Sequence, residues 1–176
     1  MSEPRIQSSR EVFSNRWVHL QEKQVVFPGA PAPESYYSLK SPDYVCVIGQ
    51  TADGRFPIVR QYRPAVEAMT WEFPSGLKEE GETPEANALR EFEEETGYRA
   101  ATLEPLCILL TDVGRLENRM HGFYARGVVP VENHVMEQGL ELRLVTRAEL
   151  EAMIDDGSFN FALHLAVWER FLRKVG

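Results

Sequence analysis

The sequence predicts one mixed α/β domain in which strands outnumber helices and form a mostly antiparallel or mixed sheet. A chain of 176 residues, 43% hydrophobic and 26% charged, suits a single domain with a sizeable core. Short alternating or apolar segments, separated by turn residues, recur along the chain and indicate strands. Helical signals occupy fewer segments than strand signals, which disfavours a simple doubly wound sheet.

The first half of the chain supplies several of these strands. Residues Val12–Phe27 partly alternate apolar and polar side chains, as half-buried strands do. Pro28–Pro33 provide a turn or loop and Ser35–Lys40 resume the extended pattern, so we predict an N-terminal β-hairpin region. A nearly continuous apolar run, Asp43–Gln50, predicts a buried central strand, and the turn after it leads into a further strand, Phe56–Arg63.

Capping residues locate the helices of the second half. Thr83 is a good N-cap, Pro84 suits a first helical turn, and Gly97 is placed for a left-handed C-cap. A capping box that begins at Thr146 opens a short helix, which we expect to end near Gly157. The remaining elements are three strands and an amphipathic terminal helix, at Leu103–Leu110, Met120–Val129, Leu140–Val145 and Phe161–Val175.

Charge and cysteine content narrow the classes of function. The formal net charge of −8, from 27 acidic and 19 basic residues, disfavours nonspecific binding of nucleic acid. Cys46 and Cys107 lie in apolar surroundings, as buried reduced thiols do, and do not suggest a disulfide framework or a metal site. Because the N-terminus lacks the apolar core of a signal peptide and no apolar run has membrane-spanning length, we expect a cytoplasmic protein without a membrane partner.

The stretch REFEEE places unusual negative charge in one helical turn. At about 100° per residue, Glu91, Glu94 and Glu95 converge on one face of the helix. Glu93 points elsewhere, and Arg90 lies four residues before Glu94, where it can pair with that carboxylate. Three carboxylates on a rigid face suit a hard cation such as Mg²⁺ or Mn²⁺. The alternative interpretation is a solvated acidic face.

The spacing around this helix resembles the Nudix box. The box pattern is Gly, five residues, Glu, seven residues, Arg-Glu, an apolar residue, any residue, Glu-Glu, any residue, Gly and an apolar residue. Residues 76–98 fill every fixed position, with aromatic Phe92 and Tyr98 where aliphatic residues are more usual. The segments NRWVHLQEKQVVF, VRQYRPAVEAMTWEFPSGLKEEGE and ELRLVTRAEL also resemble the branch of ADP-ribose and other nucleoside-diphosphate-sugar pyrophosphatases. This resemblance implies a Nudix α/β/α sandwich around a mixed β-sheet, in a single domain over residues 1–176.

The resemblance implies a role for each member of the box. Glu91 and Glu95 are expected to be the principal metal ligands, and Glu94 a further ligand or a base for water. The backbone carbonyl of Ser75 matches a position that contributes another oxygen ligand, and Arg90 is expected to hold the carboxylates in place. Bound Mg²⁺, or Mn²⁺, would neutralise the diphosphate and position the attacking water. The products would be a nucleoside monophosphate and a sugar phosphate.

Residues outside the box are expected to bind substrate. Arg63 matches a phosphate-contacting arginine of this branch, and Arg60 is expected beside it on the same strand face. Trp17 and Tyr36 match aromatic positions that sandwich the base, and such stacking tolerates different bases. In relatives the N-terminal part, here residues 1–40, is exchanged across a homodimer, so Trp17 is expected to serve the partner's site.

The general base is expected in the loop VENHVMEQG, which precedes the LELRLV strand. Alignment on that strand puts Gln138 where the branch has a glutamate, so we predict the adjacent Glu137 as the base. The alternatives are Glu132, Glu141 and Glu94. Within the box, Glu82 is expected either to contact the metal or to cap its loop.

A second departure from the branch concerns the substrate. ADP-ribose pyrophosphatases usually carry a Ser-Pro-Gly turn after the box, and the corresponding region here is TDVGRLEN. The prediction is therefore a pyrophosphatase of nucleoside diphosphates linked to a sugar, of the ADP-ribose, ADP-sugar or GDP-sugar type, in which ADP-ribose itself is the less supported substrate. Alternatives are another diphosphate (a dinucleoside polyphosphate, a nucleotide cofactor or an RNA 5′ end) and a noncatalytic ligand sensor. The four histidines are interpreted as structural or surface residues: His19, His121, His134 and His164.

Overall fold

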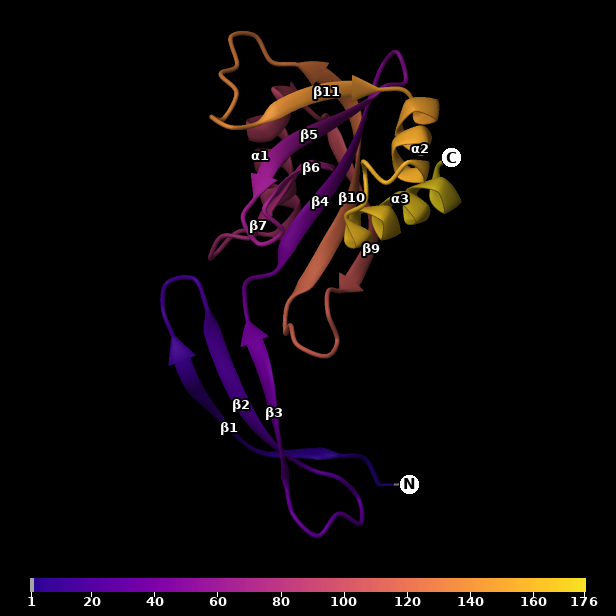
Figure 1. The fold of residues 1–176 in the computed structure, drawn as a ribbon. Helices are drawn as coiled ribbons and strands as arrows, with labels where there is room; N and C mark the ends of the chain where they lie inside the picture. The colour runs from indigo at the N-terminus through magenta and orange to yellow at the C-terminus, as the bar shows by residue number, and fades with distance from the viewer. Residues whose placement is uncertain (1) are drawn as a thin grey trace. The chain divides into compact units, whose positions relative to one another are not determined.

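A computed structural model describes residues 2–176, and its contacts divide the chain into two compact units (Figure 1). The N-terminal unit comprises the chain up to Pro42 together with Leu110–Arg119. The main unit comprises Asp43–Leu109 and Met120–Gly176. The expectation of a single domain stays a prediction beside this division.

The N-terminal unit is a three-stranded antiparallel sheet in the order β1-β2-β3. The strands are β1 (Arg5–Ser14), β2 (His19–Val26) and β3 (Glu34–Lys40). The predicted hairpin is present as β2 and β3, but the predicted continuous run Val12–Phe27 is broken at Asn15. There the Asn15 side chain accepts hydrogen bonds from two backbone N–H groups, 2.7 and 2.8 Å away, and this short side-chain turn reverses the chain.

Eight strands form two sheets in the main unit. They are β4 (Tyr44–Thr51), β5 (Phe56–Arg63), β6 (Ala68–Glu72), β7 (Ser75–Leu77), β8 (Tyr98–Arg99), β9 (Thr102–Leu110), β10 (Arg119–Pro130) and β11 (Glu141–Val145). One sheet has the order β7-β4-β10-β8, with β9 also paired to β10, and the other has the order β11-β5-β6. Strands β4 and β10 run parallel to each other. Strand β7 pairs antiparallel with β4 and β8 pairs antiparallel with β10, so the sheet is mixed, as predicted.

Three helices complete the main unit, α1 (Pro84–Thr96), α2 (Arg147–Asp155) and α3 (Ala162–Lys174). The predicted caps of α1 are confirmed: the Thr83 hydroxyl accepts a hydrogen bond from the backbone of the first turn, and Gly97 adopts a left-handed φ of 68°. The capping box at the start of α2 is also confirmed, with both reciprocal hydrogen bonds between Thr146 and Glu149. Within residues 2–176, no helix has the length and apolar character needed to span a membrane.

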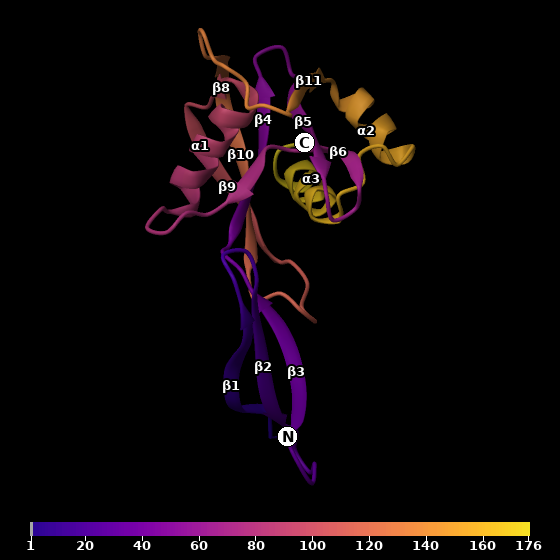
Figure 2. The same cartoon turned by 60° about the vertical axis from the view of Figure 1, so that its left-hand side comes forward.

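The helices lie on both faces of the β4–β10 sheet, with α1 on one side and α3 on the other (Figure 2). Because strand side chains alternate, odd-numbered residues of β4 face α1 and even-numbered residues face α3. The core on the α1 side includes Val45, Val47, Ala88, Phe92, Phe123 and Ala125. The core on the α3 side includes Cys46, Ile48, Met120, Tyr124, Val167, Trp168 and Phe171. The predicted sandwich of helices around a mixed sheet is therefore confirmed.

His164 of helix α3 is a core residue rather than a ligand. Its side chain is fully buried, and the ring stacks on Phe161 at a centroid distance of 4.1 Å. Its Nδ1 accepts a hydrogen bond from the backbone N–H of Phe73 at 3.1 Å, so the neutral ring carries its proton on Nε2. Burial lowers the pKa of His164 to about 3, from an ordinary value of 6.5. The buried ring therefore stays neutral in the folded protein near pH 7.

We expect His164→Leu to flatten the acid dependence of stability. Since the folded-state pKa of His164 lies below its unfolded value, its contribution to stability is present above pH 6.5 and is lost as the pH falls toward about 3. Between pH 7 and pH 5 this single proton accounts for about 2 kcal/mol of unfolding free energy. Urea unfolding at both pH values should show the variant losing about that much less than wild type. Equal losses in the two proteins would contradict this assignment.

Candidate active site

Two glutamates of helix α1 lie against the short strand β7. Strand β7 pairs with β4 and precedes the loop that leads into α1. The backbone N–H of Ser75 donates to Glu95 Oε2 at 2.9 Å, and Glu95 is only 6% exposed. One turn earlier, Glu91 approaches Gly76 so closely that a Cβ on that glycine would lie 2.0 Å from the Glu91 carboxyl carbon. Glu91 and Glu95 are thus packed side by side against the Ser75–Gly76 backbone.

Burial raises the pKa of both carboxyl groups. It raises the pKa of Glu95 to about 8, with nearby Glu91 and Glu72 adding to the rise while the Ser75 N–H and Arg63 oppose it. The pKa of Glu91 is also raised, chiefly by burial, although Arg90 opposes that rise. A cation beside these oxygens would offset the cost of ionising them. An all-oxygen pair of this kind, next to backbone, fits a hard divalent cation.

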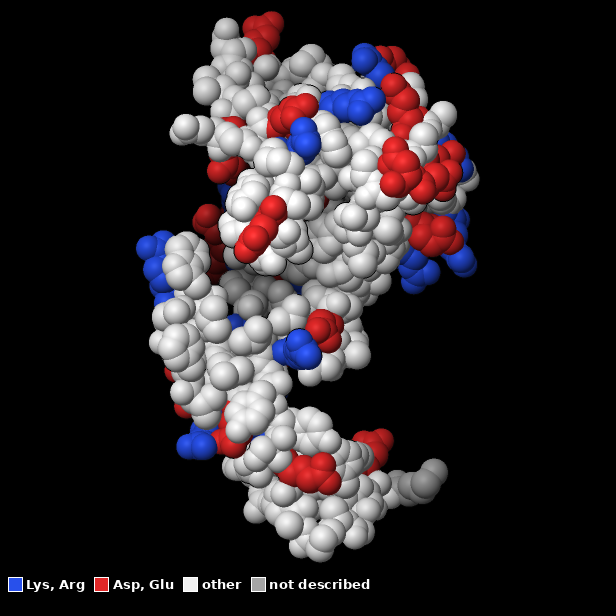
Figure 3. Space-filling model, in the orientation of Figure 1, with Lys and Arg blue, Asp and Glu red and all other residues white. Residues whose placement is uncertain are grey.

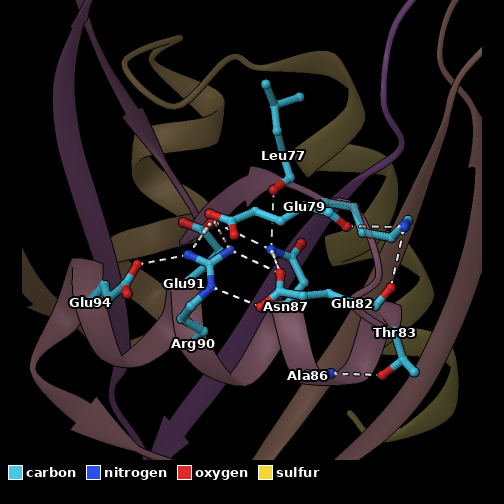
Figure 4. A network of polar contacts seen from close by, with 10 residues as sticks. Leu77, Glu79, Glu82, Thr83, Ala86, Asn87, Arg90, Glu91 and Glu94 are labelled. Atoms are coloured by element: carbon cyan, nitrogen blue, oxygen red, sulfur yellow. Dashed lines mark hydrogen bonds and ion pairs between the residues drawn. The ribbon is translucent and has the colours of Figure 1, made fainter.

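Arg90 is the centre of an ion-pair network that includes Glu82, Glu91 and Glu94 (Figure 4). Its guanidinium contacts both carboxylate oxygens of Glu82, with Nε to Oε1 at 3.2 Å and Nη2 to Oε2 at 3.1 Å. The same guanidinium lies 2.9 Å from Glu91 and 2.9 Å from Glu94, the latter at the predicted spacing of four residues. The Glu82 side chain therefore ties the loop that precedes α1 to Arg90.

Glu94 and Glu93 do not lie against β7 as Glu91 and Glu95 do. The Glu94 side chain is 54% exposed and its oxygen turns to Arg90. Glu93 leaves the cluster, as predicted, and binds Arg99 with two hydrogen bonds of 2.8 Å. Within residues 2–176, no three His, Cys, Asp or Glu side chains already stand within reach of one ion. Glu91 and Glu95 lie together, whereas Glu94 turns to Arg90, so the predicted convergence of all three carboxylates is not observed among the described residues.

Arg63 is fixed by a buried acidic partner. Its Nε and Nη2 donate to the two carboxylate oxygens of Glu72 at 2.8 and 2.6 Å. Glu72 is 1% exposed, and although burial pushes its pKa up, hydrogen bonds from Arg63 and Thr70 outweigh that effect and lower the pKa overall. The Arg63 side chain itself is 40% exposed. A partly exposed guanidinium clamped on one edge is suited to bind an anion with its other edge.

Arg60 lies on the opposite face of strand β5 from Arg63, so the expectation of a shared face is wrong. Side chains alternate along a strand, and positions three apart point in opposite directions. Arg60 lies over the Trp71 ring, 5.7 Å from its centroid, and its Nη1 is 3.5 Å from Glu141. The Arg60 guanidinium is therefore engaged with neighbouring strands rather than with the Arg63–Glu72 pair.

The two aromatic candidates both belong to the N-terminal sheet. Trp17 lies at the turn between β1 and β2 with 73% of its surface exposed, and the Arg16 guanidinium stacks 4.1 Å from its ring centroid. Tyr36 of β3 is 47% exposed and pairs with Lys23. Lys23, opposite Tyr36, is four strand residues along β2 from His19, or about 14 Å. His19 is the first residue of β2 and follows the turn that holds Trp17. The two rings therefore lie apart along this sheet and do not form a clasp within it.

The loop between β10 and β11 carries two of the candidate bases, Glu137 and Glu132, together with Gln138. Glu137, Gln138 and Glu132 are all exposed on it. The first half of this loop is attached to the end of helix α1: His134 Nε2 lies 3.1 Å from the Glu94 carbonyl oxygen, and the His134 ring packs against Gly97. Glu137 as the base remains a prediction on this geometry.

Two residues of the site escaped the sequence analysis. Glu72 is the acidic partner of Arg63, and its position inside the apolar run Trp71–Phe73 was a usable signal, because a carboxylate there needs a partner. Asn87 lies four residues before Glu91 on the same helix face and is fully buried. The spacing of four could have indicated contact with Glu91, but burial of the amide could not be read from it.

Comparison with known proteins finds a matching family, relatives and a solved structure of similar fold. The NUDIX domain family model matches residues 40–162. A methanol dehydrogenase activator of Bacillus methanolicus is 35% identical over 125 residues, which cover 71% of this chain and 67% of that protein. An ADP-ribose pyrophosphatase of Bacillus subtilis is 34% identical over 135 residues, covering 77% and 70%. A solved structure described as an ADP compounds hydrolase aligns with a TM-score of 0.85 at 21% identity, covering 98% of this chain and 94% of the other. The last likeness concerns the fold alone.

Proposed function

The chain belongs to the Nudix hydrolase family, and from that premise we propose that it hydrolyses the diphosphate bond of a nucleoside diphosphate linked to a sugar. The products are a nucleoside monophosphate and a sugar phosphate. The observation that carries the proposal is the pair of Glu95, which is buried, and Glu91, which is partly buried, held against Ser75 and Gly76 with raised pKa values. Support for the substrate class comes from the Bacillus subtilis relative, which is an ADP-ribose pyrophosphatase.

Nudix hydrolases generally use divalent metal ions, and the residues present fit one. We propose Mg²⁺, with Mn²⁺ as a substitute, held by Glu91, Glu95 and the carbonyl oxygen of Ser75, with Glu94 as a further ligand. When bound, the ion supplies positive charge that offsets the charge of the diphosphate. The all-oxygen donor set and the raised pKa values of Glu91 and Glu95 support a hard cation over a soft one.

The chain's own residues bind and orient the substrate. Arg63, clamped by Glu72, presents its exposed edge to a phosphate oxygen. Arg90 keeps Glu94 in place, where its carboxylate can accept a proton from the attacking water. We propose Glu137 as the general base, on the loop that His134 attaches to the end of helix α1, with Glu94 as an alternative.

We also propose a homodimer with exchanged N-terminal strands. The N-terminal unit exposes many large apolar side chains, and uncharged side chains cover most of its visible surface in Figure 3. The exposed apolar side chains of this unit include Ile6, Val12, Phe13, Trp17, Val18, Tyr36 and Tyr37. Several large apolar side chains exposed on one unit are typical of an interaction surface.

The dimer makes a prediction for Trp17. If Trp17 stacks on the base in the partner's site, Trp17→Ala should raise KM by about tenfold while kcat changes little, because a stacking contact binds ground state and transition state alike. Steady-state kinetics measure this, and sedimentation at micromolar concentration measures the dimer. A monomeric mass would reject the exchanged arrangement.

The cytoplasm is proposed as the compartment, because both cysteines are free thiols. Burial raises the pKa of Cys46 and of Cys107, which keeps both thiols protonated and unreactive. A pair of this kind suits a reducing environment.

A substrate panel tests the proposal. The protein is incubated with Mg²⁺ and ADP-ribose, an ADP-sugar, a GDP-sugar, a dinucleoside polyphosphate and a dinucleotide cofactor, and the products are identified by mass. Release of a nucleoside monophosphate and a sugar phosphate from at least one sugar compound supports the proposal. Turnover of the dinucleoside polyphosphate alone would move the substrate class, and binding of every compound without turnover would indicate a ligand sensor instead.

A further inference from the structure

Asn87 connects three separate parts of the candidate site through one side-chain amide. It lies in the first half of helix α1 and is fully buried. Its Nδ2 lies 3.1 Å from the Leu77 carbonyl oxygen at the end of β7, 3.2 Å from Glu82 in the loop, and 3.5 Å from Glu91 on the next helical turn (Figure 4). The three oxygens belong to the strand, the loop and the helix that together form the site.

The chemistry of these partners fixes the orientation of the amide. The Leu77 carbonyl and the Glu82 carboxylate, whose pKa Arg90 lowers, can only accept hydrogen bonds, so the NH₂ end must face them, and the rotated amide would set oxygen against oxygen. The consequence is that Asn87 Oδ1 is buried and accepts no hydrogen bond from residues 2–176. Buried acceptors without a partner are rare in folded proteins. A position that served packing alone would be filled by an apolar side chain, as at neighbouring Ala88.

Asn87 and Arg90 grip the same two carboxylates from different donors. Arg90 contacts Glu82 and Glu91 with a charged guanidinium, whereas Asn87 contacts them with a neutral amide. The guanidinium also contacts Glu94. The amide is held by packing on every side and by the Leu77 carbonyl, so it gives Glu91 a fixed reference to the backbone of β7.

We propose that Asn87 is a positioning residue, whose amide holds the Glu91 carboxylate in the orientation in which it meets the divalent cation. It does not itself contact the cation or the substrate. This inference rests on the proposed function, because it assigns Asn87 to the same metal site. Partners that orient metal-binding carboxylates typically contribute 10- to 100-fold to metal affinity. With a contact of 3.5 Å to Glu91, we expect the lower end of that range.

The test measures Mn²⁺ binding by calorimetry or electron paramagnetic resonance, without substrate, on wild type, Asn87→Ala and Asn87→Leu. Alanine is the better helix former, so Asn87→Ala is expected to fold and decides the matter if the leucine variant does not. Both variants should bind Mn²⁺ about tenfold more weakly than wild type. At saturating metal, the KM for the sugar substrate should stay within about twofold, since Asn87 does not contact it.

Thr146→Ala is the matched control for lost stability. Its hydroxyl caps helix α2 and makes no contact with Glu82 or Glu91, so this variant should be less stable yet bind Mn²⁺ as wild type does. Wild-type affinity in the folded Asn87 variants would overturn the inference and leave the proposed function standing. A wild-type protein that binds no Mn²⁺ would overturn both.

Discussion

Glu95→Gln is expected to lower turnover of the sugar substrate on the order of a thousandfold, equivalent to about 4 kcal/mol of transition-state stabilisation. The substitution keeps the shape of the side chain and its ability to accept the Ser75 N–H, which lies 2.9 Å from Glu95 Oε2. It removes only the negative charge with which Glu95 would hold the cation. A large loss of activity in a folded protein would therefore report on charge at this position. Steady-state kinetics with saturating Mg²⁺ measure it.

Glu93→Gln is the matched control on the same helix. Glu93 pairs with Arg99 at the surface, away from Glu91 and Glu95, and such exposed ion pairs contribute little to stability. Its turnover should stay within about twofold of wild type, because the charge it removes lies outside the site. If Glu95→Gln kept a tenth or more of wild-type turnover, Glu95 would not be a principal ligand, and the proposed mechanism would fail with it.

Glu95→Gln is also expected to change the stability of the protein without metal, and here the variant should gain rather than lose. The pKa of Glu95 in the folded protein is about 8, above its ordinary value of 4.5. Because the folded-state pKa is raised, Glu95 contributes fully to the free energy of unfolding below pH 4.5, and this contribution is lost as the pH rises through 8. Glutamine does not titrate, so in EDTA above pH 8 the variant should be more stable than wild type by more than about 1 kcal/mol. Urea unfolding of both proteins at pH 5 and pH 8.5 measures how this difference in unfolding free energy changes with pH.

The parts of the site that the sequence predicts are those set by local geometry. Helix α1 begins and ends where its caps, Thr83 and Gly97, require, and the Arg90–Glu94 pair follows from a spacing of four. These features depend only on residues close in the chain. The direction of Glu93 away from the cluster follows from the same helical geometry.

The parts that escape prediction depend on strand register. The pairing of β5 with β6 sets Arg63 opposite Ala68 and Glu72 opposite Val59, so the contact between the Arg63 and Glu72 side chains cannot be read from periodicity alone. Arg60 was expected beside Arg63 by proximity in sequence, and the alternation of a strand places it on the other face. The turn at Asn15 depends on one side chain that caps the backbone, within a run whose alternation otherwise continues.

Gly76 shows why one fixed position of the box must be glycine. Its φ is not in the left-handed region, so backbone strain does not require glycine there. Space does: a Cβ would lie 2.0 Å from the Glu91 carboxyl carbon and 2.3 Å from each of its oxygens. The obstructing group is the far end of a flexible side chain, which can move aside while the helix stays in place. A methyl group at this position should therefore displace the carboxylate and spare the fold.

We accordingly expect Gly76→Ala to lower turnover by about 10- to 100-fold, the range typical when a metal-binding carboxylate loses its orientation, while the unfolding free energy changes by less than about 1 kcal/mol. Gly157→Ala is the contrasting control. Gly157 has a φ of 79° and open space around its Cβ position, so alanine there should cost about 1 kcal/mol of stability and leave turnover unchanged. Kinetics and urea unfolding of both variants separate lost space from lost backbone freedom. Full turnover in Gly76→Ala would show that the Glu91 carboxylate need not lie against β7.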